Sequence, residues 1–358
     1  MSVRNERSAA RWMTVFRWVL IALALGALGN TLRHAELGRV ARLIEAIGAP
    51  IAIVLVPWLL AMILQTVGYA RIIRALGRPT SFPRLLSVML SAEAVLMSFP
   101  GGAALAETIN PYLLKRRCGV PAPEGLAAVA AKKALILLSN ALYLGVAVVV
   151  GGAWLRSASR ALLGAPGLEW LVAGTAVTLL AASIAMSRVI FSGSVASRSR
   201  GLLRRIPSAR LRRWLDDEER GFTETDQHFA ALAASRISVL GGATAAFLGC
   251  WLVEGAEALV ILRLLHVEIS YAEVLAFETV VSLLKSLAFM VPAGLGVQDA
   301  GYVAFFAAFG IPDAATLGVA FVLVKRAKEV IWIAVGYLLF LFLGDLPAPV
   351  RAPSLEGA

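Results

Sequence analysis

Charged side chains occur inside apolar segments of this chain, where each must have a reason to be there. A charge at the centre of a membrane span costs about 2.5–3.5 kcal/mol on insertion scales, so it needs either a partner or a function. Acids and bases are nearly balanced in the set, which comprises Glu93, Lys132, Lys133, Glu254, Glu257, Glu278, Lys285, Lys325, Arg326, Lys328 and Glu329, with Glu107 and Asp299 nearby. Two interpretations are open: buried ion pairs that fix helix packing, or a polar binding site.

Two breaks rich in proline and glycine lie beside these charges. Pro100-Gly101-Gly102 and residues 292–296 interrupt apolar segments, and each break precedes a short apolar run. A helix N-terminus carries the positive end of the helix dipole, so two such ends near Lys and Arg side chains would form an anion site that suits a lipid phosphate. We therefore predict that the substrate is bound by charged and glycine residues from both breaks and their surroundings: Gly101, Gly102, Glu107, Lys132, Lys133, Glu257, Lys285, Gly294, Gly296, Asp299, Lys325 and Arg326.

The acids that follow the two breaks, Glu107 and Asp299, have two alternative roles. They are either counter-ions that hold the lysines in place, or proton or ion sites that drive a transport cycle. Under the first alternative, we expect Glu107 to pair with Lys133 and Asp299 to pair with Lys325, because each pair occupies equivalent places after its break.

Signals for metal, cofactor or known catalytic chemistry are weak. The three histidines, His34, His228 and His266, are widely spaced, which argues against a zinc site. The two cysteines, Cys118 and Cys250, show neither metal nor redox spacing. The sequence contains no Walker loop and no GxSxG motif. We expect no metal, no cofactor and no disulfide.

The composition identifies the class of protein. Of 358 residues, 59% are hydrophobic and 16% are charged, whereas a soluble domain carries about 25% charged residues. The apolar segments cover approximately residues 12–31, 47–69, 85–99, 126–150, 168–186, 237–262, 271–291 and 314–343. Segments near twenty residues indicate membrane-spanning helices, so we predict an all-α polytopic membrane protein. The net charge of +11 is then a matter of topology and lipid contact, and not of nucleic-acid binding.

An internal repeat organises these segments. Residues 47–150 resemble residues 239–342 at an offset of 192, with prolines, glycines and buried charges in register. Residues 85–99 are too few to cross a membrane comfortably, and with residues 103–114 they predict a re-entrant hairpin; residues 271–310 predict its counterpart. We therefore expect one transmembrane domain over residues 1–358, built as an inverted-repeat helical bundle with two re-entrant hairpins.

Orientation follows from the loops between the segments. Residues 187–236 contain ten arginines, which predicts a cytoplasmic loop by the positive-inside rule. The basic run Lys115-Arg116-Arg117 falls on the same side if each hairpin returns to its starting face. Residues 151–167 carry few cations and predict an external loop, and both termini are then cytoplasmic.

Two motifs resemble those of the flippase-like membrane family, also called the lysylphosphatidylglycerol synthase transmembrane region. They read FPGGAALAETINPYLLKRRCGVPAPEGLAAVAAKK at residues 99–133 and VPAGLGVQDAGYVAFFAAFGIP at residues 291–312. The resemblance extends from about residue 12 to residue 343. Gln298 stands where the family commonly has arginine, and Lys132-Lys133 where a Glu-Arg pair is common. The segment GVQDAGY, residues 296–302, resembles the corresponding segment of a subgroup found with hopanoid biosynthesis proteins.

The resemblance implies a lipid flippase or transporter of the bacterial inner membrane that moves a polar or anionic lipid, hopanoid-related in that subgroup. Two alternatives stay open: an intramembrane lipid-modifying enzyme that uses Glu107, Asp299 and Lys133 as acid–base groups, and a scaffold or regulator of a lipid-synthesis complex. The sequence shows no soluble aminoacyl-transfer domain after its last apolar segment, so we expect no aminoacyl transfer. The expected partners are membrane lipids and lipid-synthesis proteins.

Overall fold

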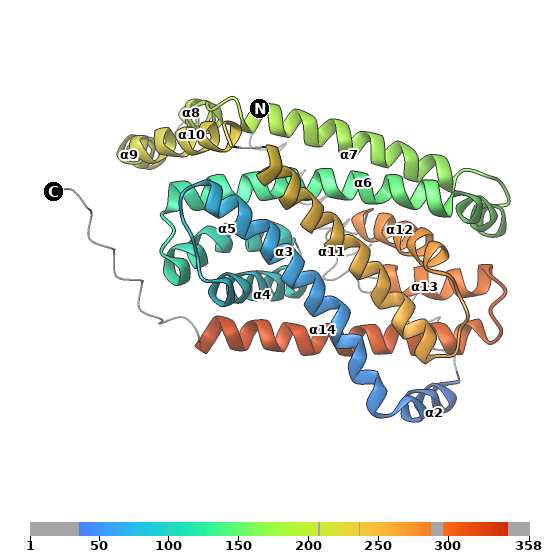
Figure 1. Ribbon diagram of the computed structural model, residues 1–358. Coiled ribbons are helices and arrows are strands. Elements are labelled where there is room, and N and C mark those ends of the chain that lie inside the picture. Colours follow the sequence, from blue (N-terminus) through green and yellow to red (C-terminus); the bar gives the residue numbers. More distant parts are fainter. Residues whose placement is uncertain (1–35, 100, 207, 236, 288–295, 343–358) are drawn as a thin grey trace.

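The computed structural model describes residues 36–342, apart from residues 100, 207, 236 and 288–295 (Figure 1). Every regular element in this part of the chain is a helix, which confirms the predicted all-α class. Four helical stretches are long and apolar enough to cross a membrane: Ala49–Ala75, Ala122–Leu163, Leu168–Ile190 and Ile237–Leu264. The protein is therefore a polytopic helical membrane protein. The expected first span, residues 12–31, lies outside the described residues.

The helices divide into two halves, which are joined in sequence by one apolar helix and three short helices. The first half contains α2 (Leu37–Ile47), η1 (Ala49–Val54), α3 (Leu55–Ala75), α4 (Phe82–Ser98), α5 (Gly102–Leu113), η2 (Leu114–Cys118) and α6 (Ala122–Leu163). The connecting part contains α7 (Leu168–Ile190), α8 (Val195–Leu203), α9 (Ala209–Asp217) and α10 (Glu219–Ala233). The second half contains α11 (Ile237–Leu264), α12 (Tyr271–Leu287), α13 (Val297–Ala308) and α14 (Ala314–Phe342).

The two halves have the same order of helices. In each, a long helix is followed by two short helices and a second long helix, so that α3 to α6 correspond to α11 to α14. Ala122 and Ala314, the first residues of α6 and α14, are 192 residues apart. Figure 1 shows that α6 and α14 run in opposite directions, as do α3 and α11, which pack against each other. This is the arrangement of an inverted repeat.

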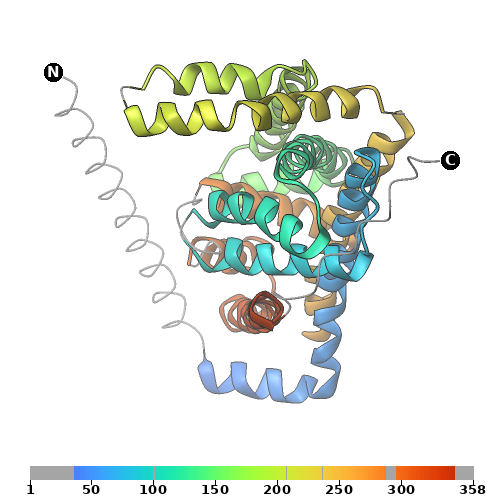
Figure 2. The ribbon, with the colours of Figure 1, turned by 90° about the vertical axis from the view of Figure 1, so that its left-hand side faces the viewer.

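Each short-helix pair packs against the long helix of the other half. Helix α4 contacts α14, and α12 contacts α6. Figure 2 shows α4 and α5 between α6 and α14. The close approach of α12 to α6 requires a glycine on α6, because a Cβ at Gly151 would lie 2.8 Å from the Cβ of Ala276 on α12. Small residues of this kind allow membrane helices to approach closely.

The helices α4 and α5 form the first hairpin. They contain 17 and 12 residues, about 26 and 18 Å at 1.5 Å per residue, which is less than a hydrocarbon core of about 30 Å. Gly101 has a φ of +65°, a conformation that suits glycine. A Cβ at Gly102 would lie 2.2 Å from the carbonyl oxygen of Leu96, so the chain turns back tightly onto α4. The predicted break at these residues is thus a turn between two packed helices.

Helix α6 is longer than its sequence suggests. It contains 42 residues and continues to Leu163, so residues 151–163 are helical where a loop was predicted. That this end of α6 is external stays a prediction. Gly151 lies within this helix and packs against α12. Trp154 continues the helix and stacks on Phe309, with ring centroids 3.9 Å apart. The connection to α7 is short and begins at Gly164, which has a φ of +72°.

The arginine-rich part between the halves folds into separate short helices. Asp226 on α10 accepts hydrogen bonds from the backbone N–H groups of Ala196 and Ser197 at the start of α8, at 2.8 and 3.0 Å. Arg200 on α8 donates to Glu219 at 2.6 Å, and this hydrogen bond raises the pKa of the guanidinium. These contacts pack the connecting helices together, and α10 packs on α6. That this face is cytoplasmic stays a prediction.

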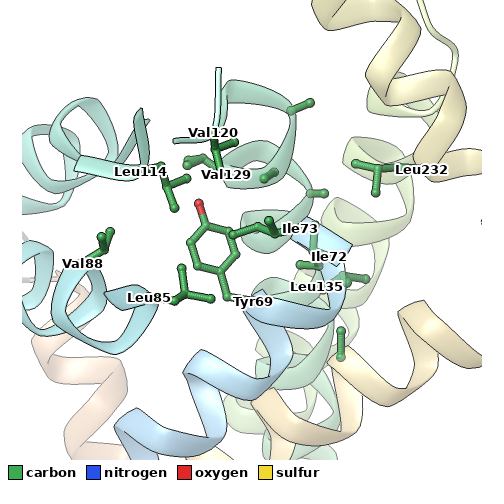
Figure 3. Close-up of a cluster of buried hydrophobic side chains, with 14 of the residues drawn as sticks. Tyr69, Ile72, Ile73, Leu85, Val88, Leu114, Val120, Val129, Leu135 and Leu232 are labelled. Atoms are coloured by element: carbon green, nitrogen blue, oxygen red, sulfur yellow. The ribbon is translucent and has the colours of Figure 1, made fainter. Parts of the chain in front are cut away.

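An apolar core surrounds Tyr69 of the first half (Figure 3) and also includes residues of α7, α10 and α11. The Tyr69 ring lies among Leu85, Leu114 and Val129, and its hydroxyl donates to Asn110 at 3.0 Å. Arg117, expected in a basic loop, is instead almost fully buried on η2. It donates to the backbone oxygens of Leu339 and Phe340 on α14, at 2.7 and 3.1 Å. The side chain therefore fastens the first half to the end of the second.

Candidate functional site

Four charged residues lie within five positions near the middle of α14: Lys325, Arg326, Lys328 and Glu329. Helix α14 has 29 residues, about 44 Å at 1.5 Å per residue, and is otherwise apolar. Lys328 and Glu329 are buried. Charges at this position need compensation, and neighbouring helices of the second half supply it.

Two lysines of α14 are held by carboxylates of α11 and α12. Lys328 Nζ donates to both oxygens of Glu257, at 2.9 and 2.7 Å. Lys325 Nζ donates to Glu278 Oε1 at 3.0 Å and lies 3.9 Å from Glu257 Oε1. Its ammonium group also lies 4.8 Å from the centre of the Tyr302 ring. Burial and short distances make these pairs far less screened than surface pairs.

Arg326 connects α14 to the start of α13. Its Nε and Nη2 donate to Asp299 Oδ1 at 3.0 and 2.7 Å, and its Nη1 donates to Glu329 Oε2 at 2.6 Å. The other oxygen of Asp299 accepts the backbone N–H of Gly296 at 2.8 Å, which caps α13. Gly296 and Asp299 thus form a helix N-terminus that is already occupied by a carboxylate of the same chain.

A hydrogen-bond chain continues this network along α13. Tyr302 donates its hydroxyl proton to Glu278, with both carboxylate oxygens at 3.1 Å. A tyrosine has only one hydroxyl proton, so the Tyr302 oxygen accepts a hydrogen bond from Nε2 of Gln298, which lies 2.8 Å away. The amide orientation of Gln298 is fixed by this order. Its Oε1 is buried and has no partner among the described residues.

Part of this network lines a cavity of about 150 Å³ at the junction of the two halves. Its walls come from α3, α4, α6, α11, α12, α13 and α14. The charged and amide groups that line it are Glu93, Glu254, Glu257, Glu278, Gln298, Lys325, Lys328 and Glu329. Trp58, Tyr143 and Trp251 supply aromatic walls, and Trp58 stacks on Trp332 of α14 with ring centroids 4.7 Å apart. No group of three potential metal ligands occurs within the residues described.

Three further charged residues of the first half, Glu107, Lys132 and Lys133, lie outside the cavity, unlike Glu93 of α4. Lys133 pairs with Glu107 at 2.9 Å, as the repeat suggests, but both are partly exposed and line a groove between α5, α6 and α7. This groove has a volume of about 750 Å³ and is mostly apolar, with Tyr112, Leu126 and Met186 among its lining residues. Lys132 is buried, with its ammonium 4.9 Å from the centre of the Tyr69 ring and 3.9 Å from Met89 Sδ.

The structure therefore brings together only part of the predicted set. Lys325, Arg326, Glu257, Asp299 and Gly296 belong to one network, whereas Lys132, Lys133, Glu107, Gly101 and Gly102 do not line the cavity. Gly294 and the side chain of Lys285 lie outside the described residues. The expected pairing of Lys325 with Asp299 is replaced by pairs of Lys325 with Glu278 and of Arg326 with Asp299.

Two of the polar groups, Gln298 and Tyr302, were not among the predicted site residues. They are four residues apart on α13 and therefore share one helix face, which the spacing alone could have shown. Glu278, Lys328 and Glu254 were visible as charges in apolar segments but not as members of one site. The cavity carries more carboxylates than cations, so it does not resemble a simple anion site.

Comparison with known proteins decides the family. The family model described as the lysylphosphatidylglycerol synthase TM region matches residues 15–343. The chain belongs to this family. No curated protein and no solved structure matched the chain.

Membership in the lysylphosphatidylglycerol synthase TM region identifies a multi-pass membrane protein concerned with lipids. The matched residues include both hairpins, the connecting helices and all of α14, so the charged cavity lies wholly within the family domain.

Proposed function

We propose that this chain transports a lipid across the bacterial inner membrane, with the polar headgroup passing through the charged cavity and the acyl or polycyclic part remaining in the bilayer. The observation that carries the proposal is the position of the cavity. It lies where helices of both halves meet and is lined by charged groups inside an otherwise apolar bundle. Transporter sites commonly lie at the interface of inverted repeats.

The lining is suited to a headgroup with both acceptors and donors. Lys325 and Lys328 can bind phosphate oxygens, and the glutamates can accept from hydroxyl groups. A headgroup that crosses the hydrocarbon without such partners loses its hydrogen bonds to water, and no hydrogen bonds to protein replace them. The aromatic walls formed by Trp58, Tyr143 and Trp251 suit the boundary between polar and apolar parts of a lipid.

The apolar groove between α5, α6 and α7 supports lipid as the substrate. Its volume of about 750 Å³ is lined mainly by apolar side chains, and the Lys133–Glu107 pair lies in the same groove. An acyl chain or a triterpenoid skeleton fits such a surface. We propose it as a lateral contact for the lipid, and phospholipids and hopanoids with a polar headgroup as the classes to test.

Reconstitution into liposomes tests the proposal. Purified protein is added to vesicles containing a labelled phospholipid or a polar hopanoid in one leaflet, and both leaflet distribution and lipid mass are measured. Transport predicts redistribution between leaflets without a change in lipid mass. A new lipid species would instead indicate an enzyme, and neither result would indicate a scaffold or regulator. Empty vesicles and vesicles with a Lys328→Met variant are the controls.

A further inference from the structure

A groove of about 540 Å³ lies where the end of α3 meets the start of α4 and the start of α11. Its walls are mainly apolar and include Val67 and Ala70 of α3, Phe82 of α4 and Val239 of α11. None of its lining residues lines the charged cavity. Figure 1 shows this end of α3 on the side of the bundle that carries α8, α9 and α10, which is predicted to be cytoplasmic. The groove is therefore a separate hollow at one face of the membrane.

Two arginines of α3, Arg71 and Arg74, line this groove and are exposed in it. Within the residues that the structure describes, neither guanidinium has a hydrogen bond or an ion pair. The two are three positions apart and share one helix face, where like charges repel each other. The next arginine along the chain, Arg78, is instead paired with Glu124 at 2.8 Å. Two adjacent guanidinium groups with free donors favour an anion between them.

The position of Arg71 depends on a glycine of α11. A Cβ at Gly242 would lie 2.9 Å from Cζ of Arg71, so the guanidinium lies directly against this glycine. A Cβ at the preceding residue, Gly241, would have nothing within 4 Å. Gly242 therefore leaves room for the Arg71 guanidinium beside α11, whereas Gly241 does not have this role.

The internal repeat shows that the fold does not require this pair of arginines. At the offset of 192 residues, Arg71 and Arg74 correspond to Arg263 and His266 at the other end of the repeat. Arg263 donates through Nη2 to the backbone oxygen of Ile269 at 3.0 Å, so it has an acceptor in its own chain. The equivalent place thus carries one arginine with an acceptor, where α3 carries two without one.

We infer that this groove binds one anionic phospholipid, with the phosphate between Arg71 and Arg74 and an acyl chain along Val67 and Ala70. Arginine suits a phosphate because its fork of N–H donors matches two phosphate oxygens. Arg74 is next to the last residue of α3, and Val67 lies about 10 Å deeper at 1.5 Å per residue. The groove therefore changes from cationic to apolar in the direction in which a lipid changes from headgroup to acyl chain. Free phosphate would leave the apolar walls exposed to water.

The lipid in this groove is distinct from a transported lipid, because the groove and the charged cavity share no lining residue. A lipid bound here contacts both α3 and α11, the helices through which the two halves pack against each other. It therefore holds the junction of the halves together from the membrane side. The inference goes beyond the proposed function, and its binding can be measured without a transport assay.

Titration of the purified full chain with phosphatidylglycerol in a neutral detergent tests the site, with native mass spectrometry to measure the affinity of the first bound lipid. Changing Arg71→Gln and Arg74→Gln together should lower this affinity at least tenfold. Changing Arg198→Gln and Arg205→Gln together is the matched control. It removes two other exposed arginines, on and just after α8, and changes the net charge equally. This control should retain the wild-type affinity.

Three further variants test the geometry without removing a charge. Gly242→Ala should displace the Arg71 guanidinium and lower the affinity about threefold or more, whereas Gly241→Ala should leave it unchanged. Val239→Trp should also lower the affinity, because the indole fills the apolar part of the groove. Phosphatidylcholine, whose headgroup has no net charge, should bind the wild type at least tenfold more weakly than phosphatidylglycerol.

The outcomes separate the possible occupants. Equal phosphatidylglycerol affinity in the two double arginine variants would overturn the site. Displacement of phosphatidylglycerol by inorganic phosphate at equal concentration, with no effect of Val239→Trp, would show an anion site that takes no lipid. A lower melting temperature of the lipid-free Arg71 and Arg74 variant, with unchanged lipid binding, would show that another part of the chain occupies the groove. Normal phosphatidylglycerol binding in a protein that does not redistribute lipid in liposomes upholds this site and rejects transport.

Discussion

Asp299 holds Arg326 with one carboxylate oxygen and caps helix α13 with the other. One side chain thus fixes the start of α13 and the orientation of a charged residue of α14, which also bonds Glu329. The dipole end of α13 is therefore part of the protein's own ion-pair network. The same network continues through Tyr302 and Glu278 to Lys325, so the geometry of the cavity depends on the placement of α13.

Replacing Asp299 with asparagine should destabilise the protein strongly. Asparagine can retain the cap but leaves Arg326 without one of its two carboxylates, and breaking a buried pair costs about 3–5 kcal/mol. Thermal unfolding in detergent measures the change. Asp216→Asn is the control, because its pairs with Arg200 and Arg204 lie on the connecting helices with the carboxylate half-exposed, and such pairs contribute about 0–1 kcal/mol. Equal melting temperatures for the two variants would contradict the buried network.

Two neighbouring glycines of α6 should respond oppositely to alanine. A Cβ at Gly151 would lie 2.8 Å from the Cβ of Ala276, so Gly151→Ala should cost about 1–3 kcal/mol by overpacking the contact with α12. At Gly152 nothing lies within 4 Å, so Gly152→Ala should stabilise the helix by about 0.5–1 kcal/mol. Melting temperatures of the two variants test the packing between halves. A neutral Gly151→Ala would show that α6 and α12 are further apart than described.

Replacing Arg117 with lysine should destabilise the protein. Its guanidinium bonds the backbone oxygens of Leu339 and Phe340, which belong to the last turn of α14 and have no partner within that helix. It also donates to Ser91, and one ammonium group cannot reach all these acceptors. We expect Arg117→Lys to cost about 2 kcal/mol or more, since bonds to charged groups contribute about 1.5–3 kcal/mol each.

The neighbouring Arg116 offers a matched control for this change. It is exposed, and its guanidinium donates to the hydroxyl of Tyr112, four residues earlier in the chain. Arg116→Lys should therefore leave the melting temperature nearly unchanged. If both lysine variants melt together with the wild type, the connection between η2 and the end of α14 is not important for stability.

Much of the fold could be predicted from the sequence, because interruptions of a helix and charged side chains are both costly in a membrane and therefore stand out in apolar segments. Pro100-Gly101-Gly102 ends α4 where predicted, since Gly101 adopts a left-handed conformation and Gly102 touches Leu96. The end of α6 was not accessible. The apolar segment ends near Val150, but the helix continues to Leu163. The residue that Gly151 contacts, Ala276, is 125 positions away, and a local pattern cannot identify it.

The members of the site were easier to predict than their pairing. Lys325 and Arg326 stood out because they lie in an apolar segment, but successive residues of a helix point about 100° apart. They therefore meet different helices: Lys325 faces Glu278 on α12, and Arg326 faces Asp299 on α13. The repeat correctly related Lys325 to Lys133 as equivalent positions, yet could not show which neighbour each would face.

Removing both members of a cavity ion pair should not restore function. Lys325→Met with Glu278→Gln eliminates a buried pair, and such double changes are often nearly neutral for stability. If the lysine binds the headgroup, the double variant stays inactive in lipid redistribution although its melting temperature is close to that of the wild type. Full recovery of redistribution would show that this pair is purely structural.

The most direct test of the account is the rate of lipid redistribution between leaflets of liposomes that contain Lys325→Met or Lys328→Met. Both lysines line the cavity, so each variant should lower the rate by at least tenfold while the lipid mass stays constant. Arg198→Met, which removes an exposed cation on α8, is the control and should retain the wild-type rate. Wild-type rates in both cavity variants would contradict passage of the headgroup through this cavity.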